Sequence, residues 1–185
     1  MQKSRIEWTN YTLNPIKGLC PVDCKDNQGK SYCYARRMYN RFKWNPEIRW
    51  EPEQLLDLTL IPPNSKVFIG STMELFGDGI KAKWLQDLFY WWIPRYPKLT
   101  FIFLTKRPEN LINWSPFPPN CWVGVSAVDK LHFYAACHYL ADIKATIKFI
   151  SFEPLLESMA GAQPTEEHLL NGGISWIICG QQTPV

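Results

Sequence analysis

Short runs of apolar or alternating residues recur along the chain, and each is rich in β-branched or aromatic side chains. Runs of this length and composition are typical of buried strands. Five of them are "KVFIGS" (66–71), "TFIFLT" (100–105), "WVGVSA" (122–127), "IKFISF" (147–152) and "ISWIICG" (174–180). A sixth strand is expected within "WTNYTLNPIKG" near the N-terminus.

Helical patterns separate several of these strands. Apolar residues recur every three or four positions in 82–96 and in 129–143, and "SYCYARRMYNRF" predicts a helix after the first strand. Strands that alternate with helices in this way indicate parallel βαβ units, arranged as a sheet or a barrel. We therefore expect one α/β domain over residues 1–185, a length that suits a single core.

The chain stops at "CGQQTPV", shortly after the last predicted strand. In an α/β fold a covering helix would normally follow such a strand. We therefore expect either that the fold is truncated at its C-terminal end or that a partner covers this face.

Polar side chains follow the predicted strands, at the positions where parallel α/β folds bind their ligands. Ordinary loop polarity would also place charged residues there, so the set as a whole is the stronger indication. We expect this set to share one face of the sheet with the cysteine-containing loop 18–35. Its members are Ser71, Thr72, Glu74, Lys106, Arg107, Ser126, Ser151 and Glu153.

Three of the six cysteines, Cys20, Cys24 and Cys33, lie within fourteen positions. The N-terminus has no secretory signal, and no apolar run approaches the roughly 20 residues that span a membrane. We therefore expect a cytoplasmic protein with no membrane association, in which thiols stay reduced. In that setting a cysteine cluster indicates metal binding or catalysis more than a disulfide framework.

Three thiolates suit either zinc or an iron–sulfur cluster. Structural zinc takes four ligands, and the loop supplies no fourth cysteine or histidine, since the histidines are at 132, 138 and 168. A 4Fe-4S cluster held by three cysteines keeps one iron open for a small molecule. On the residues alone, a cluster, a zinc ion completed by a distant residue, and a redox-active set of free thiols all stay open.

The formal net charge is +3, and its distribution is uneven. Residues 1–50 hold ten Lys and Arg against four Asp and Glu, while the remainder holds ten against thirteen. This pattern fits a solvated basic face, or an electropositive entrance for an anionic cofactor or a nucleic acid. The sequence contains neither a P-loop nor a nucleophile elbow, so nothing favours hydrolase chemistry.

The spacing of the cysteines resembles a known signature. Cys20 and Cys24 form C-x3-C, and an aromatic residue, Tyr32, directly precedes Cys33, as in the motif of the radical S-adenosylmethionine superfamily. In succession, "IEWTNYTLNPIKG", "CYARRM", "STMELFGD", "FLTKRPEN", "PPNCWVGVS" and "FISFEPLL" also resemble a family of phage and prokaryotic proteins with a three-cysteine motif. This resemblance extends from about Ile6 to Gln182.

The resemblance implies an incomplete parallel (βα)6 barrel of the TIM type. It implies an iron–sulfur enzyme, in which Cys20, Cys24 and Cys33 hold a 4Fe-4S cluster and S-adenosylmethionine binds the open iron. The substrate is not identified. The cofactor would then be held by Glu74 with Ser71 and Thr72, by Ser126, Ser151 and Glu153 toward ribose or substrate, and by Lys106 and Arg107 toward a carboxylate or phosphate.

The sequence departs from the superfamily pattern between Cys24 and Cys33. Eight residues, "KDNQGKSY", lie there where the pattern has two. Asn27 and Gly29 predict a turn that returns Cys33 to the site. The alternative function is a phage-type module that binds nucleic acid or protein, is stabilised by zinc or a cluster, and has no radical chemistry.

Overall fold

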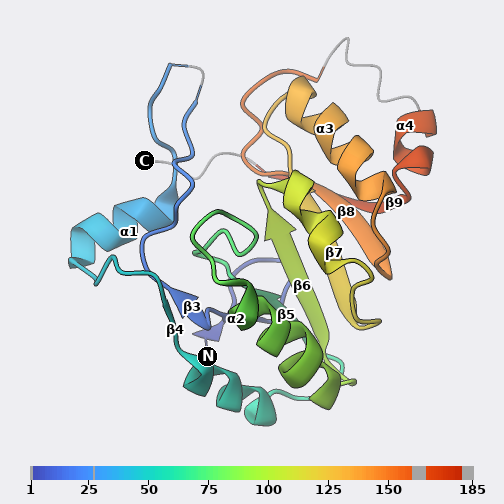
Figure 1. Cartoon of the computed structure of the whole chain (residues 1–185). Coiled ribbons are helices and arrows are strands. Elements are labelled where there is room, and N and C mark those ends of the chain that lie inside the picture. Colours follow the sequence, from blue (N-terminus) through green and yellow to red (C-terminus); the bar gives the residue numbers. More distant parts are fainter. Residues whose placement is uncertain (1, 27, 160–165, 181–185) are drawn as a thin grey trace.

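The computed structural model describes residues 2–26, 28–159 and 166–180 and centres on one large sheet (Figure 1). The sheet has seven strands in the order β1-β2-β5-β6-β7-β8-β9. β1 pairs antiparallel with β2, and the other six strands run parallel. The strands are β1 (Gln2–Lys3), β2 (Tyr11–Leu13), β5 (Lys66–Ile69), β6 (Thr100–Thr105), β7 (Cys121–Ser126), β8 (Ile147–Phe152) and β9 (Ile174–Cys179).

The prediction of six parallel strands is confirmed. Each parallel strand pairs with the next parallel strand along the chain, so the carboxyl ends of all six lie at one edge. The first and last of them, β2 and β9, do not pair with each other, so the described strands form no closed barrel. The predicted α/β fold class is therefore confirmed, whereas the barrel of the TIM type is not.

Helices and two short strands connect these elements. The helices α1 and α3 lie in the predicted segments 31–42 and 129–143, whereas the short strands and the 3-10 helices η1 and η4 were not predicted. These elements are β3 (Ile16–Lys17), α1 (Tyr34–Phe42), β4 (Arg49–Trp50), η1 (Pro52–Leu60), α2 (Ala82–Gln86), η2 (Asp87–Trp92), η3 (Ile93–Arg95), η4 (Pro108–Trp114), α3 (Lys130–Ala141) and α4 (Glu166–Asn171). Within the described residues, no helix has both the length and the apolar character needed to cross a membrane.

The helical segment predicted at 82–96 is a continuous run that changes its hydrogen bonding twice. The α-helix α2 passes into the π-helix η2 and then into the 3-10 helix η3. Pro94 has no backbone N–H to continue the α-helical ladder, which accounts for the altered pattern near the end of the run.

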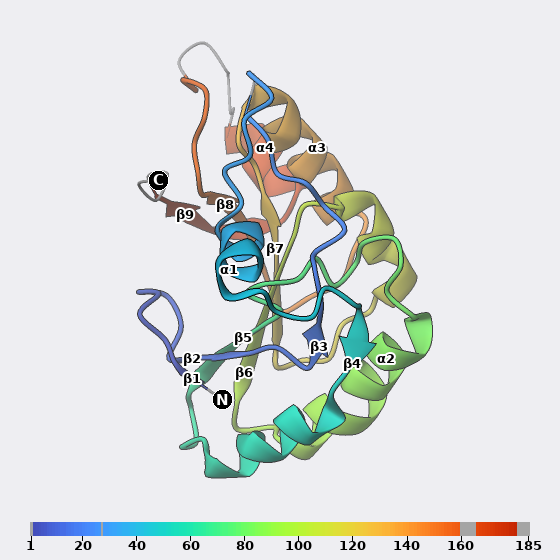
Figure 2. The same cartoon turned by 90° about the vertical axis from the view of Figure 1, so that its left-hand side faces the viewer.

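One face of the sheet packs against the helices. Phe101 and Phe103 of β6 are fully buried there, in the same core cluster as Leu88 of η2 and Phe133 of α3. Figure 2 shows α2 and α3 on the same side of the sheet. Because side chains alternate along a strand, the residues between these face the other side.

The opposite face is apolar as well, and it bends around Trp8. The Trp8 ring centroid lies 4.9 Å from that of Phe68 on β5 and 6.3 Å from that of Trp176 on β9. Four strand spacings of about 4.8 Å separate β5 from β9 in a flat sheet, so the sheet curves to bring both rings to Trp8. Gly124 of β7 makes room for the Phe149 ring, since a Cβ there would lie 2.3 Å from it.

Candidate functional site

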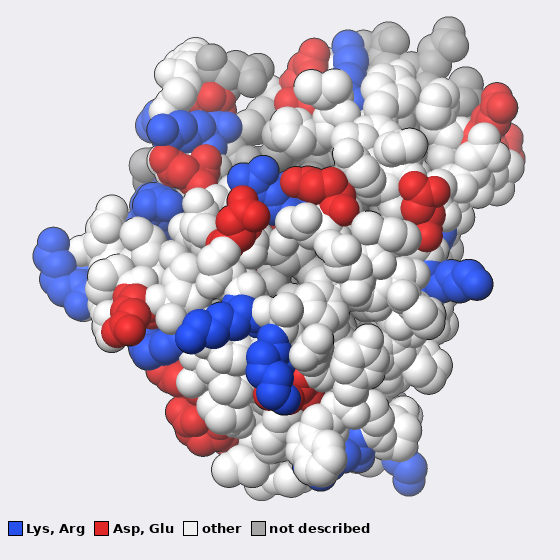
Figure 3. Space-filling view, viewed as in Figure 1, with Lys and Arg blue, Asp and Glu red and all other residues white. Residues whose placement is uncertain are grey.

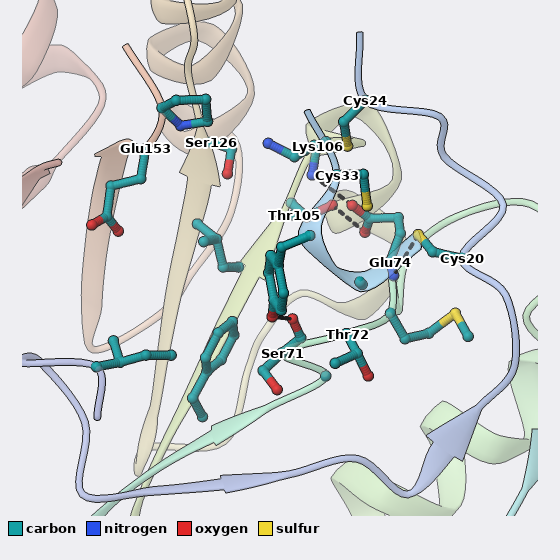
Figure 4. A pocket seen from close by; sticks show the side chains of 18 of the residues that line it. Cys20, Cys24, Cys33, Ser71, Thr72, Glu74, Thr105, Lys106, Ser126 and Glu153 are labelled. Atoms are coloured by element: carbon teal, nitrogen blue, oxygen red, sulfur yellow. Dashed lines mark hydrogen bonds between the residues drawn. The ribbon is translucent and has the colours of Figure 1, made fainter. Parts of the chain in front are cut away.

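A cavity of about 640 Å³ lies at the carboxyl ends of the parallel strands (Figure 4). Nearly all of the predicted site residues line it, although they come from five separate parts of the chain. The lining includes Cys20, Cys24, Cys33, Ser71, Thr72, Glu74, Lys106, Ser126 and Glu153. The expectation that the cysteine loop shares one face with the strand exits therefore agrees with the structure.

Ser151 and Arg107 do not line this cavity. Ser151 is fully buried at the end of β8, and its hydroxyl donates a hydrogen bond of 3.1 Å to the Glu153 carboxylate. Arg107 turns away and lies 3.8 Å from Glu109 in an exposed ion pair. Ser151 thus orients a residue of the site instead of facing its ligand. The exit after β9, residues 181–183, lies outside the described residues.

The insertion between Cys24 and Cys33 forms a small hairpin. Lys25 and Ser31 form an antiparallel bridge, and the Tyr32 N–H donates a 3.0 Å hydrogen bond to the Cys24 carbonyl oxygen. Gly29 has a positive φ of 78° at the turn, as its type predicts. Asn27, the other predicted turn residue, lies outside the described residues. The hairpin returns Cys33 to Cys24 despite the added length.

Cys33 also caps the start of helix α1. Its thiol is the N-cap and accepts a 3.5 Å hydrogen bond from the Arg36 N–H. The Cys24 and Cys33 thiols also share a hydrogen bond. This contact is the main cause of the lowered pKa of Cys33 and of the raised pKa of Cys24. Thiolate character at a helix N-terminus favours metal binding or reactivity.

Cys20, near the start of the cysteine loop, lines the same cavity. Burial raises the pKa of its thiol, although N–H groups of Glu74 and Val22 oppose this effect. The Arg36 side chain donates a 3.1 Å hydrogen bond to the Cys20 carbonyl oxygen. One arginine of α1 therefore joins the segment that carries Cys20 to the helix that begins at Cys33.

The three cysteines of the loop line the same cavity, and the cluster expected for them stays a prediction. Among the described residues, no three His, Cys, Asp or Glu side chains converge where they could hold one metal ion. A cluster does not need such convergence, because each thiolate binds a different iron. The three cysteine side chains instead line one end of the cavity, with the remaining space free for a small molecule (Figure 4).

The Glu74 carboxylate connects two strand exits. It accepts hydrogen bonds from the Thr105 hydroxyl at 2.6 Å, the Lys106 N–H at 2.7 Å and the Phe76 N–H at 3.2 Å. Burial raises the pKa of Glu74, and these three hydrogen bonds oppose the rise. Its own N–H donates to the Cys20 sulfur at 3.4 Å. Glu74 therefore positions the cysteine loop and the β6 exit, while its role toward a cofactor stays a prediction.

Sequence reasoning missed two residues that organise the site. The Asn14 side chain, just after β2, exchanges hydrogen bonds with the Ser71 hydroxyl and accepts one from the Thr72 N–H. Trp8 lines the cavity and donates a 3.3 Å hydrogen bond to Glu153. The position of Asn14 after a strand was an available signal, whereas nothing local indicates the contact of Trp8.

The comparisons with known proteins give one match. No curated protein and no solved structure matches the chain. The model of one family, described as "Protein of unknown function (DUF5131)", matches residues 3–183. Since that range is nearly the whole of the sequence, the chain belongs to this family.

Proposed function

We propose that the protein is an iron–sulfur enzyme of the radical S-adenosylmethionine type. Cys20, Cys24 and Cys33 would hold a 4Fe-4S cluster, and S-adenosylmethionine would occupy the adjoining cavity. The observation that supports this proposal is that the three thiols and the polar exits of four parallel strands line one cavity of about 640 Å³. The substrate is a further molecule that the protein modifies in the cytoplasm.

The cofactors carry the difficult chemistry in such an enzyme. When bound, a reduced cluster would supply the electron that cleaves the sulfonium of S-adenosylmethionine, and the protein's residues would bind and orient the cofactor and exclude water. The apolar wall suits the last of these roles. It is formed by Trp8, Phe68, Leu104 and Ile178, whose side chains leave water few partners at that end of the cavity.

Charged groups of the chain supply the polar contacts. The Lys106 ammonium lies 5.8 Å from the Tyr32 ring centroid and acts electrostatically on Cys24. A cation there would offset the negative charge of thiolate ligands and could pair with a carboxylate. Glu153, held by Ser151 and Trp8, is oriented to accept hydrogen bonds from hydroxyl groups.

The metal identity tests the first part of the proposal. After anaerobic reconstitution we expect about four iron and four sulfide per chain, with the broad visible absorption of a cluster. Cys24→Ala should lose both. Cys121→Ala, at a buried cysteine outside the loop, should retain them. One tightly bound zinc with no visible absorption would contradict the cluster and favour a zinc-stabilised binding module.

Cofactor cleavage tests the second part. Reconstituted protein with dithionite and S-adenosylmethionine should release deoxyadenosine, measured by chromatography. Glu153→Gln should change this yield and leave the iron content unchanged, because Glu153 lies across the cavity from the cysteines (Figure 4). An intact cluster without deoxyadenosine would contradict the enzymatic part of the proposal.

A further inference from the structure

Two aromatic rings are exposed at the outer end of helix α1. Phe42 is 53% exposed and Trp44 is 44% exposed, and their rings stack with centroids 5.4 Å apart and an interplanar angle of 22°. Trp44 also packs edge to face on the buried Tyr39 ring, at 5.2 Å. The pair is therefore a fixed aromatic platform that faces solvent.

The chain around this platform is positively charged. Residues 28–46 contain five Lys and Arg and no Asp or Glu. The Arg41 guanidinium lies 5.4 Å from the Phe42 ring centroid. Within the described residues Arg37, Arg41 and Lys43 form no ion pair, and Figure 3 shows Lys and Arg side chains at the outer end of α1.

We propose that this end of α1 binds single-stranded nucleic acid. Exposed rings offer a stacking surface for unpaired bases, and Arg41 at the Phe42 ring, with Arg37 and Lys43 close by in the sequence, matches the phosphate backbone. A duplex keeps its bases stacked inside and cannot use the rings in this way. An apolar peptide would use the rings, but it would gain nothing from three cations that have no ion-pair partner in the described part of the chain.

The position of the platform relates it to the cavity. Helix α1 begins immediately after Cys33, and its first residue, Tyr34, lines the cavity. The nine residues of the helix span about 13 Å to Phe42. The platform therefore lies about one helix length from the residue that lines the cavity, a distance that a few nucleotides of a bound strand can span. Binding on the platform does not require the cluster, so it can be tested whether or not iron is present.

Fluorescence anisotropy of the full chain with a labelled 20-nucleotide single strand tests the proposal. Phe42→Ala should weaken binding about tenfold, since each base–aromatic stack contributes on that order. Trp44→Phe should bind within roughly threefold of the wild type, because it keeps a stacking ring. Arg41→Gln with Lys43→Gln should reduce the slope of log K against log salt by about 1.4.

The controls separate stacking from charge and from folding. Trp91 is 59% exposed with Arg95 3.9 Å from its ring, and Trp91→Ala should leave binding unchanged. An abasic strand of equal length and a duplex should bind more weakly than the base-containing strand. Thermal unfolding should show that Phe42→Ala is folded. The proposal is overturned if wild type does not bind the strand, if Trp91→Ala weakens binding equally, or if the abasic strand binds as well.

Discussion

The backbone N–H of Tyr32 donates a 3.0 Å hydrogen bond to the carbonyl oxygen of Cys24, and this contact closes the hairpin that separates Cys24 from Cys33. The turn of that hairpin is held by Asp26, whose carboxylate accepts hydrogen bonds of 2.9 Å from the N–H groups of Gln28 and Lys30. An insertion folded on itself in this way adds length to the loop without separating its cysteines.

Loss of the Asp26 carboxylate should loosen this hairpin. In protein reconstituted with the proposed cluster, we expect Asp26→Ala to release iron to a chelator roughly fivefold faster, which corresponds to about 1 kcal/mol for the lost hydrogen bonds. The thermal midpoint should not change, because Asp26 is only partly buried and does not belong to the hydrophobic core. Asp26→Asn keeps an acceptor oxygen and should behave like the wild type. An unchanged release rate in Asp26→Ala would show that the hairpin does not control the cysteines.

Glu74 should matter for stability as well as for the site. Both oxygens of the Glu74 carboxylate accept hydrogen bonds, so in Glu74→Gln the amide N–H2 must face a group that also donates. The free energy of unfolding in urea should therefore fall by about 1–3 kcal/mol. Thr105→Val removes one of the three donors and also the oxygen that accepts a 2.8 Å hydrogen bond from the Arg107 N–H, so it should cost about 1–2 kcal/mol. A Glu74→Gln variant as stable as the wild type would contradict the central place of the carboxylate in this network.

Gly124 should not tolerate a side chain. A Cβ at this position would lie 2.3 Å from the Phe149 ring, so Gly124→Ala should destabilise the protein by about 1–3 kcal/mol. Phe149→Leu provides space, and the double variant should lose less stability than the sum of the single ones. Urea unfolding of all four proteins measures the coupling. Strict additivity would mean that the ring and the glycine do not pack as described.

Asp129 caps helix α3 and should make stability depend on acid. Burial alone would raise the pKa of Asp129, but hydrogen bonds from the His132 N–H at 2.8 Å and from its ring outweigh this effect and lower it. The carboxylate therefore stabilises the fold above its unfolded pKa of about 3.8, and this contribution is lost as pH falls through the lower folded pKa.

Two variants separate the cap from the charge. Asp129→Ala should lose about 1 kcal/mol at neutral pH. Asp129→Asn should keep most of the cap, but its stability should no longer depend on this carboxylate below about pH 4. Thermal unfolding across that range provides the measurement. An identical pH profile for wild type and Asp129→Asn would rule out this role of the carboxylate.

The positions of several strands could be predicted from the composition of short segments. The predicted segments 100–105 and 147–152 coincide with β6 and β8, because each combines a short apolar run with polar or proline-containing flanks. The first strand is shorter than its predicted segment, since Pro15 follows Asn14 and ends the pairing of β2. The 3-10 helix η1 has no clear apolar period, which explains why sequence reasoning did not find it.

The sequence predicted which residues come together at the site, but it did not predict which partners their side chains contact. Parallel strands bring their carboxyl ends together, and that rule, with the cysteine loop, placed most of the predicted site residues at one cavity. Whether Glu74 faces a ligand or Thr105 depends on how two loops pack, and Arg107 turned toward Glu109 for similarly local reasons. The first choice depends on segments distant in sequence and the second on a neighbour two residues away, and the strand pattern indicates neither.

The hydrogen bond from Trp8 to Glu153 joins positions 145 residues apart. Neighbouring parallel strands, in contrast, are also neighbours along the chain, so their pairing can extend one unit at a time as synthesis proceeds from the N-terminus. The segment with Trp8 is made early, but its partner at the exit of β8 emerges late. We therefore expect the cavity to be completed late in folding, after most of the sheet that supports it has formed.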